Sequence, residues 1–74
     1  MRYSIVIEKG ENNYGAYSPD VPGCGTVGDT LEEVKQNIVE ALLFHIEGLI
    51  EEGLPIPEPT TQVEYVEVKI PQMS

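Results

Sequence analysis

The segment YGAYSPDVPGCGTVGDTLEE, residues 14–33, constrains the fold of this chain more than any other. Residues 14–18 alternate as in a short strand, and Pro19 and Pro22 prevent that strand from continuing because each proline lacks a ladder donor. The run from Val21 to Cys24 fits a type II turn, with proline at its second position and glycine supplying a positive φ at its third. The segment therefore predicts a short strand of a hairpin followed by a tight turn.

A long helix is expected after this turn. Two overlapping capping boxes open it, one formed by Asp29 with Glu32 and the other by Thr30 with Glu33. Helical periodicity continues to about Glu52, after which Gly53-Leu54-Pro55 supplies a stop signal.

Three further strands complete the predicted fold. Residues 2–8 and 25–27 read as the first and third strands, and residues 61–70, after a proline-rich crossover, read as the last. The order β-β-β-α-β predicts an α+β fold: an antiparallel three-stranded meander plus a fourth strand parallel to the first, in spatial order 3-2-1-4. A right-handed crossover would place the helix on one face of the sheet and leave the other face open. We expect a single domain over residues 1–70 and a C-terminal tail over residues 71–74.

The size of the chain favours self-association. At 74 residues with a single cysteine, it cannot form an internal disulfide, and one cysteine with one histidine makes a poor zinc site. Oligomerisation is the remaining way to stabilise such a small core, so we expect a homodimer or a tetramer. The sequence has no signal-peptide pattern and no apolar run long enough to span a membrane, which predicts a cytoplasmic protein with no membrane partner.

The helix offers a candidate subunit interface. One stripe is expected to pack on the sheet; it contains Leu31, Val34, Ile38, Leu42, His45 and Leu49. A second apolar stripe lies roughly 90° away by the helical period, and Phe44 projects among polar residues where a monomer gains nothing from it. The candidate interface residues are Val39, Leu43, Phe44, Ile46 and Ile50. The alternative is that the tail or the crossover folds back over this stripe.

The charge of the chain argues against direct binding of nucleic acid. Four basic residues stand against 13 acidic ones, for a formal net charge of −9, and binding to nucleic acid depends mainly on clustered cations. An acidic surface instead favours a basic partner protein, although acidic surfaces are also common in soluble proteins.

No catalytic, metal or cofactor site is predicted. Cys24 and His45 are the obvious nucleophile and base, but no signature joins them, and a packed thiol and a core-edge histidine explain them better. Asp29 is accounted for as a helix cap. An aspartate after a proline, as at Asp20, commonly stabilises a turn. Tyr17 and Asp20 are retained as candidate partner contacts, and Tyr65 is expected to pack.

The chain resembles the HicB-like antitoxin family across nearly its whole length. The resemblance is carried by PDVPGC at residues 19–24, GDTLEE at residues 28–33 and GLPIPEP at residues 53–59. It implies a partly degraded ribonuclease-H-like fold without the nuclease active site, and a role in neutralising a small basic mRNA-cleaving toxin, HicA, by covering its surface. Family members that repress their own operon carry a DNA-binding segment after the last strand. This chain stops at Ser74, directly after the expected last strand, which leaves repression by this chain an open question.

Three hypotheses for the function follow. The first is an antitoxin-type binding protein with a HicA-like partner. The second is a residual metal-dependent nuclease or hydrolase, in which Asp20 would matter for RNA cleavage. The third is a solitary, non-catalytic oligomeric binding protein without a toxin.

Overall fold

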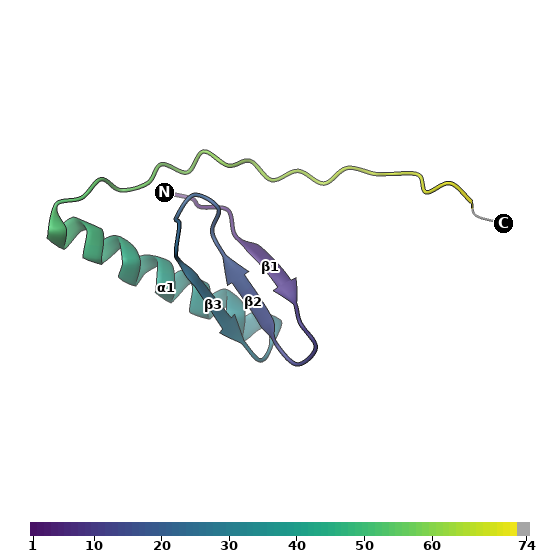
Figure 1. The fold of residues 1–74 in the computed structure, drawn as a ribbon, viewed down its shortest axis with the longest axis horizontal. Helices are drawn as coiled ribbons and strands as arrows, with labels where there is room; N and C mark the ends of the chain where they lie inside the picture. Colours follow the sequence, from purple (N-terminus) through teal and green to yellow (C-terminus); the bar gives the residue numbers. More distant parts are fainter. Residues whose placement is uncertain (73–74) are drawn as a thin grey trace.

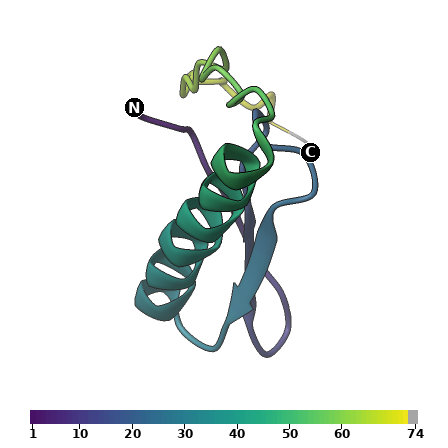
Figure 2. The same ribbon diagram turned by 90° about the vertical axis from the view of Figure 1, so that its left-hand side faces the viewer.

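The computed structural model, which describes residues 1–72, has two layers, a sheet and a helix. The strands β1 (Val6–Lys9), β2 (Tyr14–Tyr17) and β3 (Gly25–Gly28) form one antiparallel sheet in the order β1-β2-β3, and helix α1 (Leu31–Glu52) follows. The helix covers one face of the sheet and leaves the other open (Figures 1 and 2). The predicted meander and the predicted position of the helix on one face are confirmed.

The predicted turn forms between β2 and β3. The Cys24 N–H donates to the Val21 carbonyl at 3.2 Å, and Gly23 has a φ of 81°, as the third position of a type II turn requires. Gly28, at the end of β3, is required for close packing rather than for a turn conformation. A Cβ at this position would lie 2.7 Å from the Val34 nitrogen, so the absence of a side chain lets the strand approach the helix closely.

Of the two predicted capping boxes, the structure uses the one formed by Thr30 and Glu33. The Thr30 hydroxyl accepts a hydrogen bond from the Glu33 N–H at 3.1 Å, while the Glu33 carboxylate accepts one from the Asp29 N–H at 2.9 Å. The helix ends at Gly53, which is left-handed with a φ of 70° and donates its N–H to the Ile50 carbonyl. Both ends of the helix therefore lie where the local sequence predicted them.

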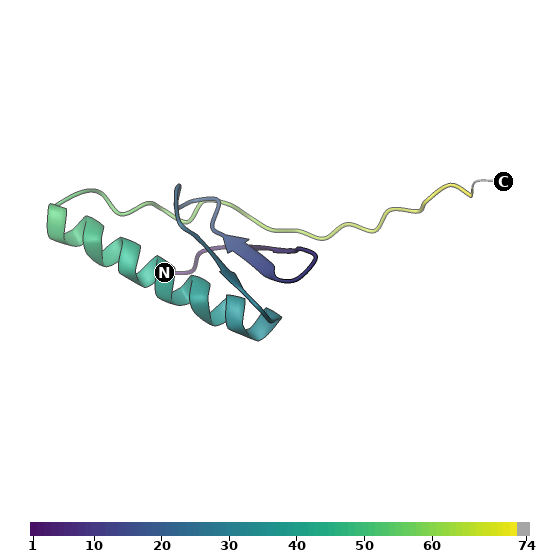
Figure 3. The ribbon, with the colours of Figure 1, turned by 60° about the horizontal axis from the view of Figure 1, so that its bottom comes forward.

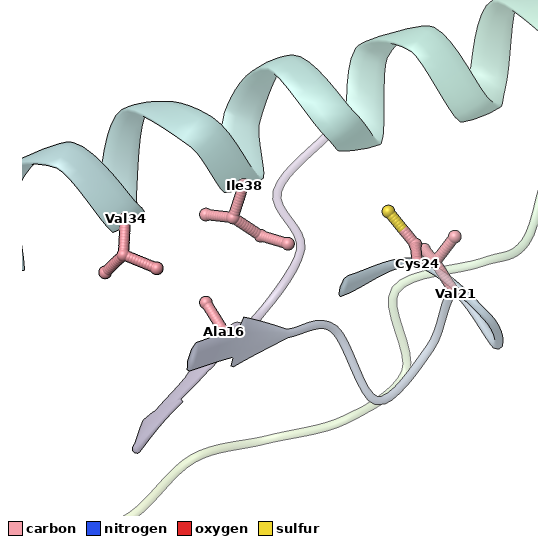
Figure 4. Close-up of a cluster of buried hydrophobic side chains, with 5 residues drawn as sticks. All are labelled: Ala16, Val21, Cys24, Val34 and Ile38. Atoms are coloured by element: carbon pink, nitrogen blue, oxygen red, sulfur yellow. The ribbon is translucent and has the colours of Figure 1, made fainter. Parts of the chain in front are cut away.

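The core occupies only part of the helix. Its buried members come from β2, the β2–β3 loop and the first half of α1 (Figure 4): Ala16, Val21, Cys24, Val34 and Ile38. Leu42 packs at the margin of this cluster, whereas Leu31, expected on the same stripe, is exposed. The C-terminal half of α1 extends beyond the sheet (Figure 1), and the overhang leaves much of its apolar surface open.

The first strand is shorter than predicted, because residues 2–5 are not part of β1. β2 ends at Tyr17, where the chain turns away, so no ladder partner remains beside these residues. In place of a ladder bond, the Ser18 hydroxyl donates to the Ser4 carbonyl at 2.9 Å.

The predicted fourth strand is not formed. Residues 54–72 contain no helix or strand, and residues 61–70, expected to lie parallel to the first strand, are extended and exposed instead. The segment passes the N-terminus and then runs away from the body of the protein (Figures 1 and 3). A strand exists only where its backbone finds a partner edge, and this segment has none within the described chain. The predicted tail over residues 71–74 falls partly on residues 73–74, which lie outside the described residues.

Candidate protein-binding surface

The open face of the sheet presents a small apolar surface. Two rows of side chains across the sheet lie on its open face. The strand register makes Val6, Tyr17 and Gly25 one of these rows, and Glu8, Gly15 and Val27 the other. The row between these two, formed by Ile7, Ala16 and Thr26, faces the helix. Because Gly15 and Gly25 carry no side chains, the Tyr17 ring stands clear and is 44% exposed. Of the two predicted partner contacts, Tyr17 is therefore accessible.

The second predicted contact, Asp20, is engaged within the chain. Its carboxylate accepts hydrogen bonds from the Thr61 N–H at 2.9 Å, the Thr61 hydroxyl at 2.7 Å and the Thr60 hydroxyl at 3.2 Å. These bonds, that from the Thr61 N–H first, lower the pKa of Asp20 from its ordinary value. Asp20 thus fastens the start of the C-terminal segment to the β2–β3 loop, and we call this arrangement the Asp20 clamp.

A second tie fixes the same crossover. The Tyr3 hydroxyl donates to the Pro57 carbonyl at 2.7 Å, a contact across most of the chain. Together with the Asp20 clamp, it holds residues 57–61 against the body of the domain. Neither contact has a signature in the sequence, because each joins residues that only the tertiary fold brings together.

The surface of the helix is strongly acidic. Its exposed carboxylates face away from the sheet: Glu32, Glu33, Glu40, Glu47, Glu51 and Glu52. Together with the formal net charge of −9, they give the domain a surface suited to a cationic partner.

The structure does not bring the candidate nucleophile and base together. Cys24 is buried in the β2–β3 loop with its thiol directed toward the helix (Figure 4), and burial raises the pKa of this thiol. His45 borders a shallow hollow with Phe44 and Glu47 on the overhanging half of α1. Within residues 1–72, no group of three or more His, Cys, Asp or Glu side chains is placed to hold a metal ion.

The predicted subunit-interface residues divide into two sets. Val39 and Ile46 line an apolar groove beside Tyr3 and Ile5, at the free edge of the first strand. Leu43, Phe44 and Ile50 do not line this groove and, like Val39, they are exposed, with Phe44 at 80%. No sequence pattern indicates the groove, because its walls come from the N-terminal residues, the helix and Ile56 of the crossover.

One further expectation is wrong. Tyr65 was expected to pack, but it is 96% exposed on the extended C-terminal segment. Its packing depended on a fourth strand in the sheet, and that strand is not formed.

Comparisons with known proteins identify the family. A family model described as the HicB-like antitoxin of bacterial toxin-antitoxin systems matches residues 3–72. The chain belongs to this family. No helix within the described residues 1–72 is long and apolar enough to cross a membrane.

Individual relatives agree with this assignment. An uncharacterized 14.9 kDa protein of Haemophilus phage HP1 is 44% identical over 66 residues, which cover 89% of this chain and 50% of the phage protein. Antitoxin HicB 1 of Photorhabdus laumondii is 37% identical over 73 residues, covering 95% of this chain and 46% of the antitoxin. The chain thus spans about half the length of both relatives.

A solved structure shares the fold. A chain of a HicA3 and HicB3 toxin-antitoxin complex superposes with a TM-score of 0.71 at 38% identity, covering 81% of this chain and 70% of that chain. The likeness supports the arrangement of a three-stranded antiparallel sheet with one helix.

Proposed function

We propose that this chain is an antitoxin-type binding protein that neutralises a HicA-like toxin. The observation that carries the proposal is the likeness, at 38% identity, to a chain of a HicA3 and HicB3 complex. Membership of the antitoxin family supports a non-enzymatic role. The resemblance implies a small basic mRNA-cleaving toxin, and a surface of net charge −9 suits such a partner.

The open sheet face is the surface that we assign to the toxin. Tyr17 is exposed there beside the apolar side chains of Val6 and Val27. A half-exposed tyrosine provides a large contact area with little loss of conformational entropy, and tyrosine is common among the residues that dominate binding energy. Glu8 lies on this face, and the net negative charge of the chain would attract a cationic toxin and raise the rate of encounter.

Binding to a HicA-type toxin tests the proposal directly. The partner is the product of a small basic open reading frame beside this one or, where none exists, the HicA3 protein. We expect a complex whose dissociation constant rises with salt, and co-expression that restores growth of cells producing the toxin. Tyr17→Ala should weaken binding by tenfold or more, whereas the matched variant Tyr17→Phe, which keeps the ring, should bind within a few fold. Absence of a complex with either toxin would contradict the proposal, and an affinity that does not change with salt would contradict the role of charge.

The assembled protein is also proposed to contain a fourth strand and a contact between helices. We propose that residues 61–70 complete a partial ribonuclease-H-like sheet only when they find a strand edge. The exposed helix residues Leu43, Phe44 and Ile50 would form a contact between copies, since a small domain gains stability by burying such surface. We also propose a cytoplasmic setting, which the free thiol of Cys24 supports.

A further inference from the structure

The C-terminal segment has the sequence of a strand but no partner. From Gln62 to Ile70 it is extended and exposed throughout, and valine and isoleucine alternate with charged residues over its second half. Val66, Val68 and Ile70 fall on one side, and Glu67 and Lys69 fall on the other, because side chains in an extended chain alternate. An exposed apolar strand of this kind is a template for pairing with another chain.

The domain offers an edge that fits such a strand. β1 pairs with β2 on one side only, so its other edge is free. An open apolar groove of about 420 Å³ lies at the N-terminal end of this edge. Tyr3 and Ile5 line one side of the groove, Val39, Leu42 and Ile46 line the helix side, and Ile56 lies at its rim.

The chain's own C-terminal segment does not place its apolar side in this groove, which none of residues 61–70 lines. The Asp20 clamp and the bond from Tyr3 to Pro57 fix the segment so that residues 61–64 face residues 2–5 across a shallow hollow. If the segment continued along this edge with Thr61 level with Arg2, Val66 would stand level with Ile7 and Ile70 with Glu11, by residue count. In that register Val68 and Ile70 would lie level with Lys9 and the hairpin turn, beyond the groove at Tyr3 and Ile5.

We propose that two copies of this chain exchange their C-terminal segments. Residues 62–70 of each copy form the fourth strand on the free edge of β1 of the other, parallel to it, and place Val66, Val68 and Ile70 in the partner's groove. The exchange is reciprocal, so a two-fold axis closes it and both free edges are covered. The charges of the two segments are opposite in sign, because residues 2–9 carry Arg2, Lys9 and Glu8 for a net +1, whereas residues 62–70 carry Glu64, Glu67 and Lys69 for a net −1.

The β1 edge of a second copy is a better partner for the C-terminal segment than another C-terminal segment is. A two-stranded ribbon that projects from both domains would stay exposed, and an isolated pair of strands is marginal in water. On the edge of β1, the same segment joins a sheet of three strands and covers apolar side chains of the helix.

Intermolecular spin-label broadening tests the exchange on the full chain. Copies that carry Cys24→Ser and Lys69→Cys, spin-labelled at residue 69, are mixed with ¹⁵N-labelled copies that carry Cys24→Ser alone. We expect the amides of residues 3–9 in the ¹⁵N-labelled copies to broaden strongly. Broadening confined to residues 62–70 would show pairing between segments, and broadening confined to the helix, or none, would show no exchange. Each of these outcomes overturns the proposal.

Sedimentation provides an independent measurement with a matched control. Val68→Glu and Lys69→Gln each lower the net charge by one, the first by adding a carboxylate and the second by removing an ammonium, at adjacent positions that face opposite sides of the segment. Val68→Glu should halve the mass of the assembly, whereas Lys69→Gln should leave it unchanged. Equal masses for the two variants would overturn the exchange.

Discussion

Asp20 holds Thr61 by two hydrogen bonds across 41 residues of sequence, one from the backbone N–H at 2.9 Å and one from the hydroxyl at 2.7 Å. This pair marks the last point at which the C-terminal segment is fastened to its own domain. Residues before it are tied to the β2–β3 loop and to Tyr3, and residues after it are extended and exposed. The clamp therefore decides where the segment leaves the domain.

The clamp should depend on pH. Hydrogen bonds lower the folded-state pKa of Asp20 below its ordinary 3.8, so the contribution of the clamp to stability is complete above that value and is lost as the pH falls through the lowered one. An NMR titration of the Asp20 carboxyl carbon should give this lower pKa. Thr61→Val, which keeps the backbone N–H, should raise the pKa only partway toward the ordinary value. An Asp20 pKa at or above 3.8 in the wild type would show that the clamp does not form in solution.

Two glycine substitutions should have opposite effects on stability. Gly28→Ala places a Cβ 2.7 Å from the Val34 nitrogen, so it should lower the free energy of unfolding by about 1–3 kcal/mol through overpacking. Gly48→Ala lies in mid-helix, where nothing is within 4 Å of the new Cβ, and should raise it by about 0.5–1 kcal/mol. Urea denaturation of the two variants measures both effects. A neutral Gly28→Ala would contradict the close packing of β3 on the helix, and a destabilised Gly48→Ala would contradict the open surroundings of Gly48.

The Cys24 thiol should react slowly. It is buried, and burial raises its pKa, so the thiolate that attacks a disulfide reagent is both scarce and inaccessible. We expect labelling by a chromogenic disulfide reagent near pH 8 to be far slower in the folded protein than in urea. Cys24→Ser should leave oligomerisation and toxin binding within a few fold. Rapid labelling of the native thiol, or loss of binding by a folded Cys24→Ser variant, would show a role beyond packing.

The exposed helix residues should contribute to self-association. Phe44 is 80% exposed and Leu43 lies beside it, so Phe44→Glu and Leu43→Glu should lower the mass found by sedimentation without unfolding the chain. Glu40→Gln, an exposed change on the same helix, is the matched control and should keep the wild-type mass. A folded wild-type monomer at high micromolar concentration would rule out this contact, as would variants that keep the wild-type mass.

The purified chain should not cleave RNA when magnesium or manganese is supplied. The described residues place no group of three or more acidic, histidine or cysteine side chains for a metal ion, and the carboxylate of Asp20 is occupied by Thr60 and Thr61. A fluorescent RNA substrate incubated with the protein and either metal checks this. Cleavage that stops on addition of a chelator and is lost in Asp20→Asn would favour the nuclease hypothesis.

The sequence alone determined the features that depend on neighbouring residues. The turn at Val21 to Cys24 follows from Pro22 and Gly23, and the helix begins at the Thr30 cap and ends at Gly53 as predicted. Each of these structures is closed by hydrogen bonds or dihedral preferences within a few residues. Local chemistry is sufficient to specify them, whatever the rest of the chain does.

Only the tertiary structure decided the relations between distant residues. The apolar stripe of the helix was evident, but the sheet is short, so burial stops near Leu42 and leaves Leu43, Phe44 and Ile50 exposed. Asp20 could not be matched to Thr61 by any spacing rule, and the strand pattern of residues 61–70 could not reveal whether an edge would be available. Strand pairing and side-chain clamps join groups that the folded backbone brings together, and alternation in the sequence specifies only the capacity to pair.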